Sequence, residues 1–126
     1  MPEGDEPKLG SLVVHLERVY ADVAALCLRL PVAVKLPTGN PLSQETRVAV
    51  GRVAETAPKM PLPIDGIHEL QIACLGWLTA AEMKHLITNE KELTEHRFAC
   101  AALGLITAEG ALVDLRIVLD DLRHWD

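Results

Sequence analysis

The sequence predicts an all-α fold, a single-domain bundle of four to five helices with Pro-rich connectors. Three observations support it. Leu, Ala and Val dominate the apolar residues, whereas the aromatics are two Trp, one Tyr and one Phe. Such a mixture suits close-packed helices better than a β-sandwich or barrel. Apolar residues recur at steps of three and four, and prolines gather in two segments that cannot be helical throughout.

The chain length of 126 residues is that of one domain with one core. The N-terminal stretch is acidic and rich in Pro and Gly, which favours an irregular segment. We therefore expect residues 1–7 to form a disordered lead and residues 8–126 to form a single helical domain.

The first predicted helix covers residues 8–30 and ends at Pro31. Its opposite face carries polar residues such as His15 and Arg18, so the helix is amphipathic. The apolar stripe steps by three and four throughout and consists of Leu9, Leu12, Leu16, Val19, Val23, Leu26 and Leu30.

A first connector follows over residues 31–42, where Val32 to Leu36 can lie extended along the core. Asn40 before Pro41 has the form of an N-cap, with Ser43 as the alternative cap. The second predicted helix extends from there to about Thr56. A second proline-rich connector then leads to residue 65.

The third predicted helix covers residues 65–88, with a break or bend near Thr79, which starts a capping-box sequence. Asn89 starts a second capping box and is expected to open a fourth helix that ends near Leu105. Thr107 is expected to open a fifth. The residues expected to fill the core include Leu16, Val23, Trp77, Leu78, Leu115 and Leu119.

The charge pattern argues against several functions. The net charge is −6, and no basic stripe is present, so nucleic acid is not an expected partner. DNA binding as an acidic dimeric regulator remains only a third interpretation. The N-terminus lacks the basic-then-apolar pattern of a secretory signal, and no apolar run approaches the about 20 residues of a membrane helix. We expect a cytoplasmic protein with no membrane partner.

The three cysteines, Cys27, Cys74 and Cys100, are widely spaced and form no CxxC motif. Each lies in an apolar helical stretch, where a free thiol behaves as a small apolar group. They are expected to be buried and unreactive, and the sequence predicts no cofactor.

Glu82 and His85 form an ExxH pair on a helix, the spacing used by di-iron carboxylate bundles. Such a centre needs a second ExxH pair, and the nearest candidate, Glu92 with His96, has the wrong spacing. His85 continues an apolar face and is expected to be at least partly buried, as a hydrogen-bonded residue at the core edge. Glu82 and His85 remain the weak candidates for a metal or small-molecule site.

The favoured function is a non-catalytic interaction or regulatory protein: an adaptor, inhibitor or accessory subunit. Val14, Ala21 and Leu28 extend the apolar surface of the first helix beyond what one core requires. We expect them to bind another protein or a second copy, with a homodimer favoured. The connector around residues 32–36 is the alternative cover for this surface. The alternative function is a helical bundle that binds a metal or a small molecule around Glu82 and His85, with or without enzymatic activity.

Overall fold

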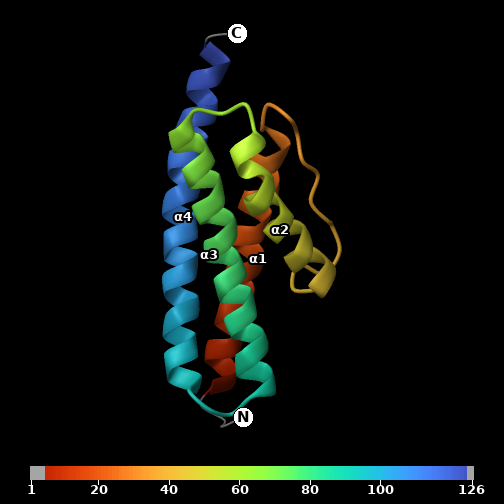
Figure 1. The fold of residues 1–126 in the computed structure, drawn as a ribbon. Coiled ribbons are helices and arrows are strands. Elements are labelled where there is room, and N and C mark those ends of the chain that lie inside the picture. The colour runs from red at the N-terminus through yellow and green to blue at the C-terminus, as the bar shows by residue number, and fades with distance from the viewer. Residues whose placement is uncertain (1–4, 125–126) are drawn as a thin grey trace.

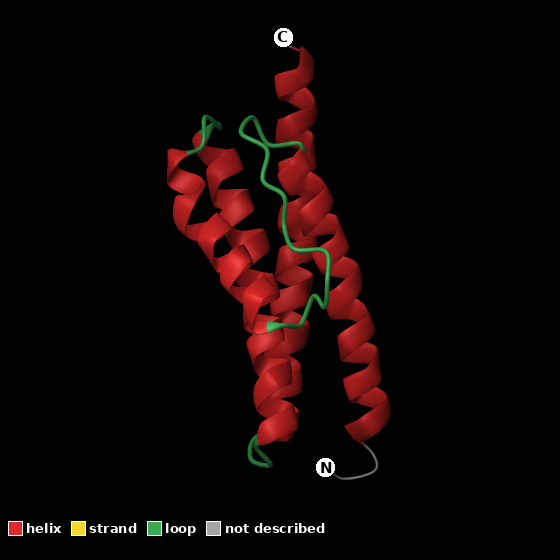
Figure 2. Ribbon diagram, turned by 90° about the vertical axis from the view of Figure 1, so that its right-hand side faces the viewer, coloured by secondary structure: helices red, strands yellow, loops and turns green. Residues whose placement is uncertain are grey.

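The computed structural model describes residues 5–124, and these form an all-helical bundle without strands. Four α-helices and one short 3-10 helix make up the described chain (Figure 1; Figure 2). In chain order they are α1 (Glu6–Leu28), α2 (Gln44–Thr56), η2 (Ala57–Lys59), α3 (Ile64–Asn89) and α4 (Thr94–His124).

The long helices α3 and α4 form an antiparallel hairpin, which is the most extensive helix pair of the molecule (Figure 1). Helix α1 packs against both of them, and the shorter α2 packs against α3. Residues 29–43 connect α1 with α2 as a long segment without helix or strand, visible in Figure 2. One face of the α3–α4 hairpin therefore has no helix packed on it from the described part of the chain, residues 5–124.

The core lies where α1, α3 and α4 meet. Of the six residues predicted to fill it, Leu78 is half-buried and the other five are buried. The Trp77 indole Nε1 donates a hydrogen bond of 2.9 Å to the Leu16 carbonyl, and the Tyr20 ring centroid lies 5.3 Å from that of Trp77. Trp77 thus joins α3 to α1 by both packing and hydrogen bonding.

The first helix begins earlier than predicted. Residues 1–4 of the expected disordered lead lie outside the described residues, but Glu6 and Pro7 belong to the first turn of α1. Proline is tolerated there because the first backbone N–H groups of a helix have no partner within the helix.

Helix α2 uses the alternative cap. The Ser43 hydroxyl oxygen accepts a hydrogen bond of 3.2 Å from the Thr46 backbone N–H. Asn40 instead accepts a hydrogen bond from the Leu42 N–H through its side-chain oxygen, at 2.9 Å. The sequence favoured Asn40 because Pro41 follows it, yet Asn40 stabilises a turn before the helix.

The predicted break at Thr79 and the predicted helix start at Thr107 are wrong, because both residues lie inside continuous helices. The Thr79 hydroxyl donates to the Leu75 carbonyl at 2.8 Å, and the Thr107 hydroxyl donates to the Leu103 carbonyl at 2.7 Å. Threonine can satisfy its hydroxyl in this way within a helix, so a capping sequence alone does not require a helix end.

Asn89 also acts differently from the prediction. It is the last residue of α3, and its side-chain nitrogen donates to the His85 carbonyl at 2.7 Å. The turn to α4 follows, and Leu93 adopts a positive φ of 58° within it. The fourth helix therefore begins at Thr94, and it continues through the fifth predicted helix to His124.

The α3–α4 hairpin is held together by small residues. A Cβ atom on Gly76 would lie 2.5 Å from the Gly104 carbonyl oxygen, and one on Gly104 would lie 2.7 Å from the Gly76 carbonyl oxygen. Ala73, Ala80 and Ala108 are buried nearby. The two backbones therefore approach too closely for any larger side chain at the two glycines.

Candidate interaction surface

Helix α4 carries two apolar stripes on opposite faces. The inner stripe is buried and consists of Ala101, Leu105, Ala108, Leu112, Leu115 and Leu119. The outer stripe is exposed and consists of Ala99, Leu103, Ile106, Gly110, Val113 and Ile117. At 3.6 residues per turn, the two stripes lie roughly 180° apart around the helix axis.

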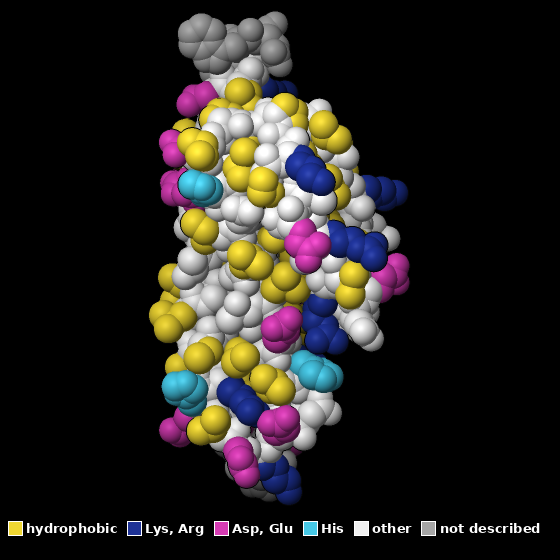
Figure 3. All heavy atoms as spheres, in the orientation of Figure 1, with side chains coloured by type: hydrophobic (Ala, Val, Ile, Leu, Met, Phe, Trp, Pro, Cys, Tyr) yellow, Lys and Arg dark blue, Asp and Glu magenta, His cyan; other side chains and the backbone are white. Residues whose placement is uncertain are grey.

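The outer stripe exposes large side chains to solvent. Leu103 is 64% exposed, Ile106 62%, and Val113 and Ile117 55% each. Its residues alternate steps of four and three over about 27 Å of helix, which is the spacing of a coiled-coil seam. Figure 3 shows hydrophobic side chains spread over α3 and α4 in this view.

Helix α3 extends this surface. Ile72 and Leu75 are exposed beside the outer stripe, and together they form what we call the apolar face. A shallow groove of about 420 Å³ runs between the two helices, with Gly76 and Gly104 in its lining. Gly76 and Gly104, which let the two helices approach, have no side chains that could fill the space above them. The surface is therefore recessed there, and this recess is the groove.

A polar seam borders the apolar face on the side of α1. His15 Nε2 and Glu109 Oε1 lie 2.5 Å apart, and Arg29 donates to Asp120 at 2.5 Å. The first contact joins α1 to α4, and the second joins Arg29, the C-cap residue that follows α1, to α4. An exposed ion pair such as that between Arg29 and Asp120 contributes little stability, but the two contacts place polar groups between the outer stripe and the surface of α1.

The predicted partner-binding residues of α1 lie at the surface. Val14 is 63% exposed, Leu28 57%, and Ala21 is also exposed. The connector lies close to two of them, because Ala21, Leu28 and Pro37 line one hollow of about 350 Å³. This α1 stripe offers only one apolar residue per heptad, half the density of the outer stripe of α4.

The candidate pair Glu82 and His85 lies on the surface of α3, at a groove of about 670 Å³ shared with α2. Both side chains are exposed, so the expected burial of His85 is wrong. In the C-terminal part of α3, the residues that face the core are instead Ala80, Ala81 and Ile87.

The neighbours of this pair do not suit a cation. Glu55 of α2 adds a second carboxylate to this groove, but Arg47 and Arg52 line it as well, and their positive charges oppose a metal ion. Among residues 5–124, no group of three or more His, Cys, Asp or Glu side chains is placed to hold a metal.

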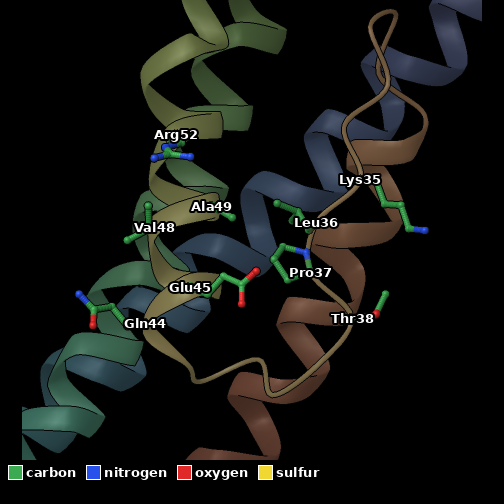
Figure 4. Close-up of a pocket in the computed structure, with 9 residues that line it drawn as sticks. All are labelled: Lys35, Leu36, Pro37, Thr38, Gln44, Glu45, Val48, Ala49 and Arg52. Atoms are coloured by element: carbon green, nitrogen blue, oxygen red, sulfur yellow. The ribbon is translucent and has the colours of Figure 1, made fainter.

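A second hollow, of about 680 Å³, lies between α2 and the connector (Figure 4). Glu45 points from α2 toward the connector, whereas Lys35 points away from α2. Its polar side chains therefore do not converge on one point, as a small-molecule site requires.

The cysteines follow the prediction in two cases of three. Cys27 and Cys74 are buried, and Cys100 is half-exposed at the groove of the apolar face. Burial raises the pKa of Cys27 to about 11 and also raises the pKa of Cys74. These two thiols are therefore protonated at neutral pH and are poor nucleophiles.

Sequence reasoning missed the outer stripe. Its steps from Ala99 to Ile117 are visible in the sequence, but the helix break predicted near Thr107 divided them between two helices. Read along one continuous helix, the same residues form two apolar stripes instead of one. The signal was therefore present, and the misassigned cap concealed it.

Comparisons with protein families, curated proteins and solved structures find no match to this chain. The segment Thr94–Arg123 is long and apolar enough to cross a membrane by length and composition. This is weak evidence, because 33% of its most apolar window is buried within the bundle and core helices pass the same test. Its apolar residues are divided between two faces, one of which the protein itself covers.

Proposed function

We propose that this protein is a non-catalytic interaction or regulatory domain that acts through an exposed apolar helix surface. The outer stripe of α4 carries the proposal, because it repeats the spacing of the buried inner stripe but is left exposed by the described residues. Contiguous apolar surface on a folded domain usually marks a contact with another molecule. The adaptor, inhibitor and accessory-subunit roles all use such a surface.

The proposal places the main contact on the apolar face and leaves the α1 stripe as a secondary surface. Val14 and Leu28 are as exposed as the residues of α4, but they are farther apart and partly bordered by the connector. A partner helix would therefore bury more apolar area on α4 than on α1.

The alternative function, a metal- or small-molecule-binding bundle around Glu82 and His85, has less support. Both side chains are exposed beside two arginines, whereas a binding site usually surrounds its ligand with buried walls. The geometry of this groove favours no particular reaction.

A pair of matched variants tests the proposed function. Ile106→Glu/Val113→Glu places two charges on the apolar face, and Val14→Glu/Leu28→Glu places two on the α1 stripe. Wild-type protein is expected to form a complex, with itself or another protein, that the α4 variant loses and the α1 variant largely keeps. Light scattering and affinity capture from source cells measure this, with circular dichroism as the folding control.

The proposed function is wrong if wild-type protein forms no complex with itself or with any captured protein. A complex that survives the α4 variant but is lost in the α1 variant would move the contact back to the α1 stripe. In that case an apolar helix surface still acts, but through the residues predicted from the sequence.

A further inference from the structure

We propose that the outer stripe of α4 binds the same stripe of a second copy, with the two helices antiparallel. This inference rests on the proposed function and names its partner. In coiled-coil terms, Leu103, Gly110 and Ile117 occupy one core position of the heptad, and Ala99, Ile106 and Val113 occupy the other. The part of the stripe from Ile106 to Ile117 thus supplies both halves of a knobs-into-holes seam, which a two-fold axis can pair with itself.

The charges beside the stripe select the orientation. On the α1 side, Glu109 and Arg116 are exposed at the edge position that pairs with its own counterpart in an antiparallel coiled coil. When Ile106 packs opposite Ile117 of the second copy, Gly110 packs opposite Val113, and Glu109 lies near Arg116 of the second copy. The register that would pair all six residues of the stripe has Ile106 opposite Gly110, and it is less favourable because it places Glu109 beside Glu109 of the second copy. The two-fold axis repeats this attraction, so the dimer gains it twice.

A parallel pair is less favourable. It would bring Glu109 near Asp114 of the second copy, and the two-fold axis would repeat that repulsion. Arg116 would meet Asp121 of the second copy, so attraction and repulsion would offset each other. Among Glu109, Asp114 and Arg116 the antiparallel pair has only attractive contacts, because Asp114 then lies near the uncharged Thr107 of the second copy. At each end of this seam Leu103 lies opposite Asp120 of the second copy.

The position of Gly110 agrees with this arrangement. A Cβ atom on Gly110 would have no neighbour within 4 Å, so the fold of one chain does not require glycine there. In the antiparallel register, Gly110 lies opposite Val113 of the second copy, close to the two-fold axis. A residue without a side chain lets the larger valine enter, and the helices approach closely at the centre of the seam.

Cross-linking tests the orientation and the register together. Ile106→Cys and Ile117→Cys are prepared in the full chain with Cys100→Ser, and one of them carries a longer tag. Cys27 and Cys74 can remain, because they are buried. Under mild oxidation, the antiparallel dimer is expected to yield the mixed disulfide between the two variants, while each variant alone stays mostly uncross-linked.

Each other result overturns the inference. A disulfide that forms readily in Ile106→Cys alone indicates a parallel pair, since residue 106 then faces itself. No cross-link in any mixture indicates a different surface or register. Wild-type protein that sediments as a monomer at tens of micromolar has no self-association, although it can still bind another protein as the proposed function states.

Two further measurements complete the test. Ile106→Glu/Val113→Glu should sediment as a monomer with unchanged helix content, whereas Val14→Glu/Leu28→Glu should remain dimeric. Flotation with neutral and anionic phospholipid vesicles examines a lipid surface as the occupant. A monomer that floats with vesicles, and loses this in the α4 variant, would replace the second copy by a membrane.

Discussion

The inner and outer stripes of α4 have the same spacing and similar composition, but only one of them is covered by this chain. The inner stripe packs against α1 and α3, and Ala108 lies beside Gly76, where the α3 and α4 backbones come close. The outer stripe has neither neighbour. Spacing shows which residues can pack together, whereas the presence of a covering helix decides whether they contribute to folding.

The largest expected difference between the stripes concerns truncation of a large side chain. Leu115→Ala should reduce the free energy of unfolding by about 2–5 kcal/mol, because Leu115 is fully buried and its removal leaves a cavity. Leu16→Ala on α1 should cost a similar amount. Urea denaturation measures both, at a concentration where sedimentation shows monomers.

Ile106→Ala is the matched control on the outer stripe. It should change the unfolding free energy of the monomer by no more than about 0.5 kcal/mol, as for exposed substitutions generally. Equal losses for Leu115→Ala and Ile106→Ala would show that both faces of α4 are buried within one chain.

Two glycines on α4 provide the next comparison, because they should respond to alanine with opposite signs. Gly104→Ala should destabilise the protein by about 1–3 kcal/mol, since its Cβ atom would lie 2.7 Å from the Gly76 carbonyl oxygen and the helices would have to separate. Gly110→Ala should stabilise the monomer by about 0.5–1 kcal/mol through its better helix propensity.

The two glycine variants are best measured in the Ile106→Glu/Val113→Glu background, where assembly does not contribute to unfolding. Thermal and urea denaturation should agree on both signs. A neutral Gly104→Ala would mean that the hairpin relaxes without loss, and the close approach of α3 and α4 would then not be a packing requirement.

The smallest expected effect lies at the edge between α3 and α4. Desolvation, and then the nearby Asp114 and Asp65, raise the pKa of Glu69. Because the folded-state pKa is above the unfolded-state pKa, ionised Glu69 opposes folding at neutral pH, and this opposition is lost as the pH falls below the usual range of glutamate. Glu69→Gln should therefore stabilise the protein at pH 7 by under about 1 kcal/mol.

The pH dependence provides the control for Glu69→Gln. Its advantage over wild type should disappear at about pH 3, below the usual pKa range of glutamate, where Glu69 is protonated in both the folded and the unfolded chain. An advantage that stays constant between the two pH values would have a cause other than the charge of Glu69.

The elements of the fold were largely predictable from the sequence. The apolar stripe of α1, the end of α2 at Thr56 and most core residues agree with the structure, because burial and helical spacing dominate there. The ends of α3 and α4 were harder to predict. Thr79 and Thr107 have the sequence signature of caps, but only the packed structure determines whether a helix continues through such a residue.

The type of candidate surface was predicted from the sequence, but its main location on α4 was not. An exposed apolar stripe was expected on the first helix, and Val14, Ala21 and Leu28 are indeed exposed. The denser stripe on α4 is visible in the sequence once this helix is continuous, but which of its two stripes is exposed depends on α1 and α3, which cover one side of this helix and leave the other open. That information resides in contacts between distant parts of the chain, which local spacing does not encode.

The position of Trp77 makes its fluorescence a probe of how α1 packs against the α3–α4 hairpin. Its ring is fully buried, so its emission should shift to longer wavelength when water reaches it. The same indole donates its hydrogen bond to α1, and separation of α1 from the hairpin would therefore change its surroundings directly. With Trp125, which lies outside the described residues, replaced by Phe, fluorescence would follow the docking of α1 onto the α3–α4 hairpin in real time.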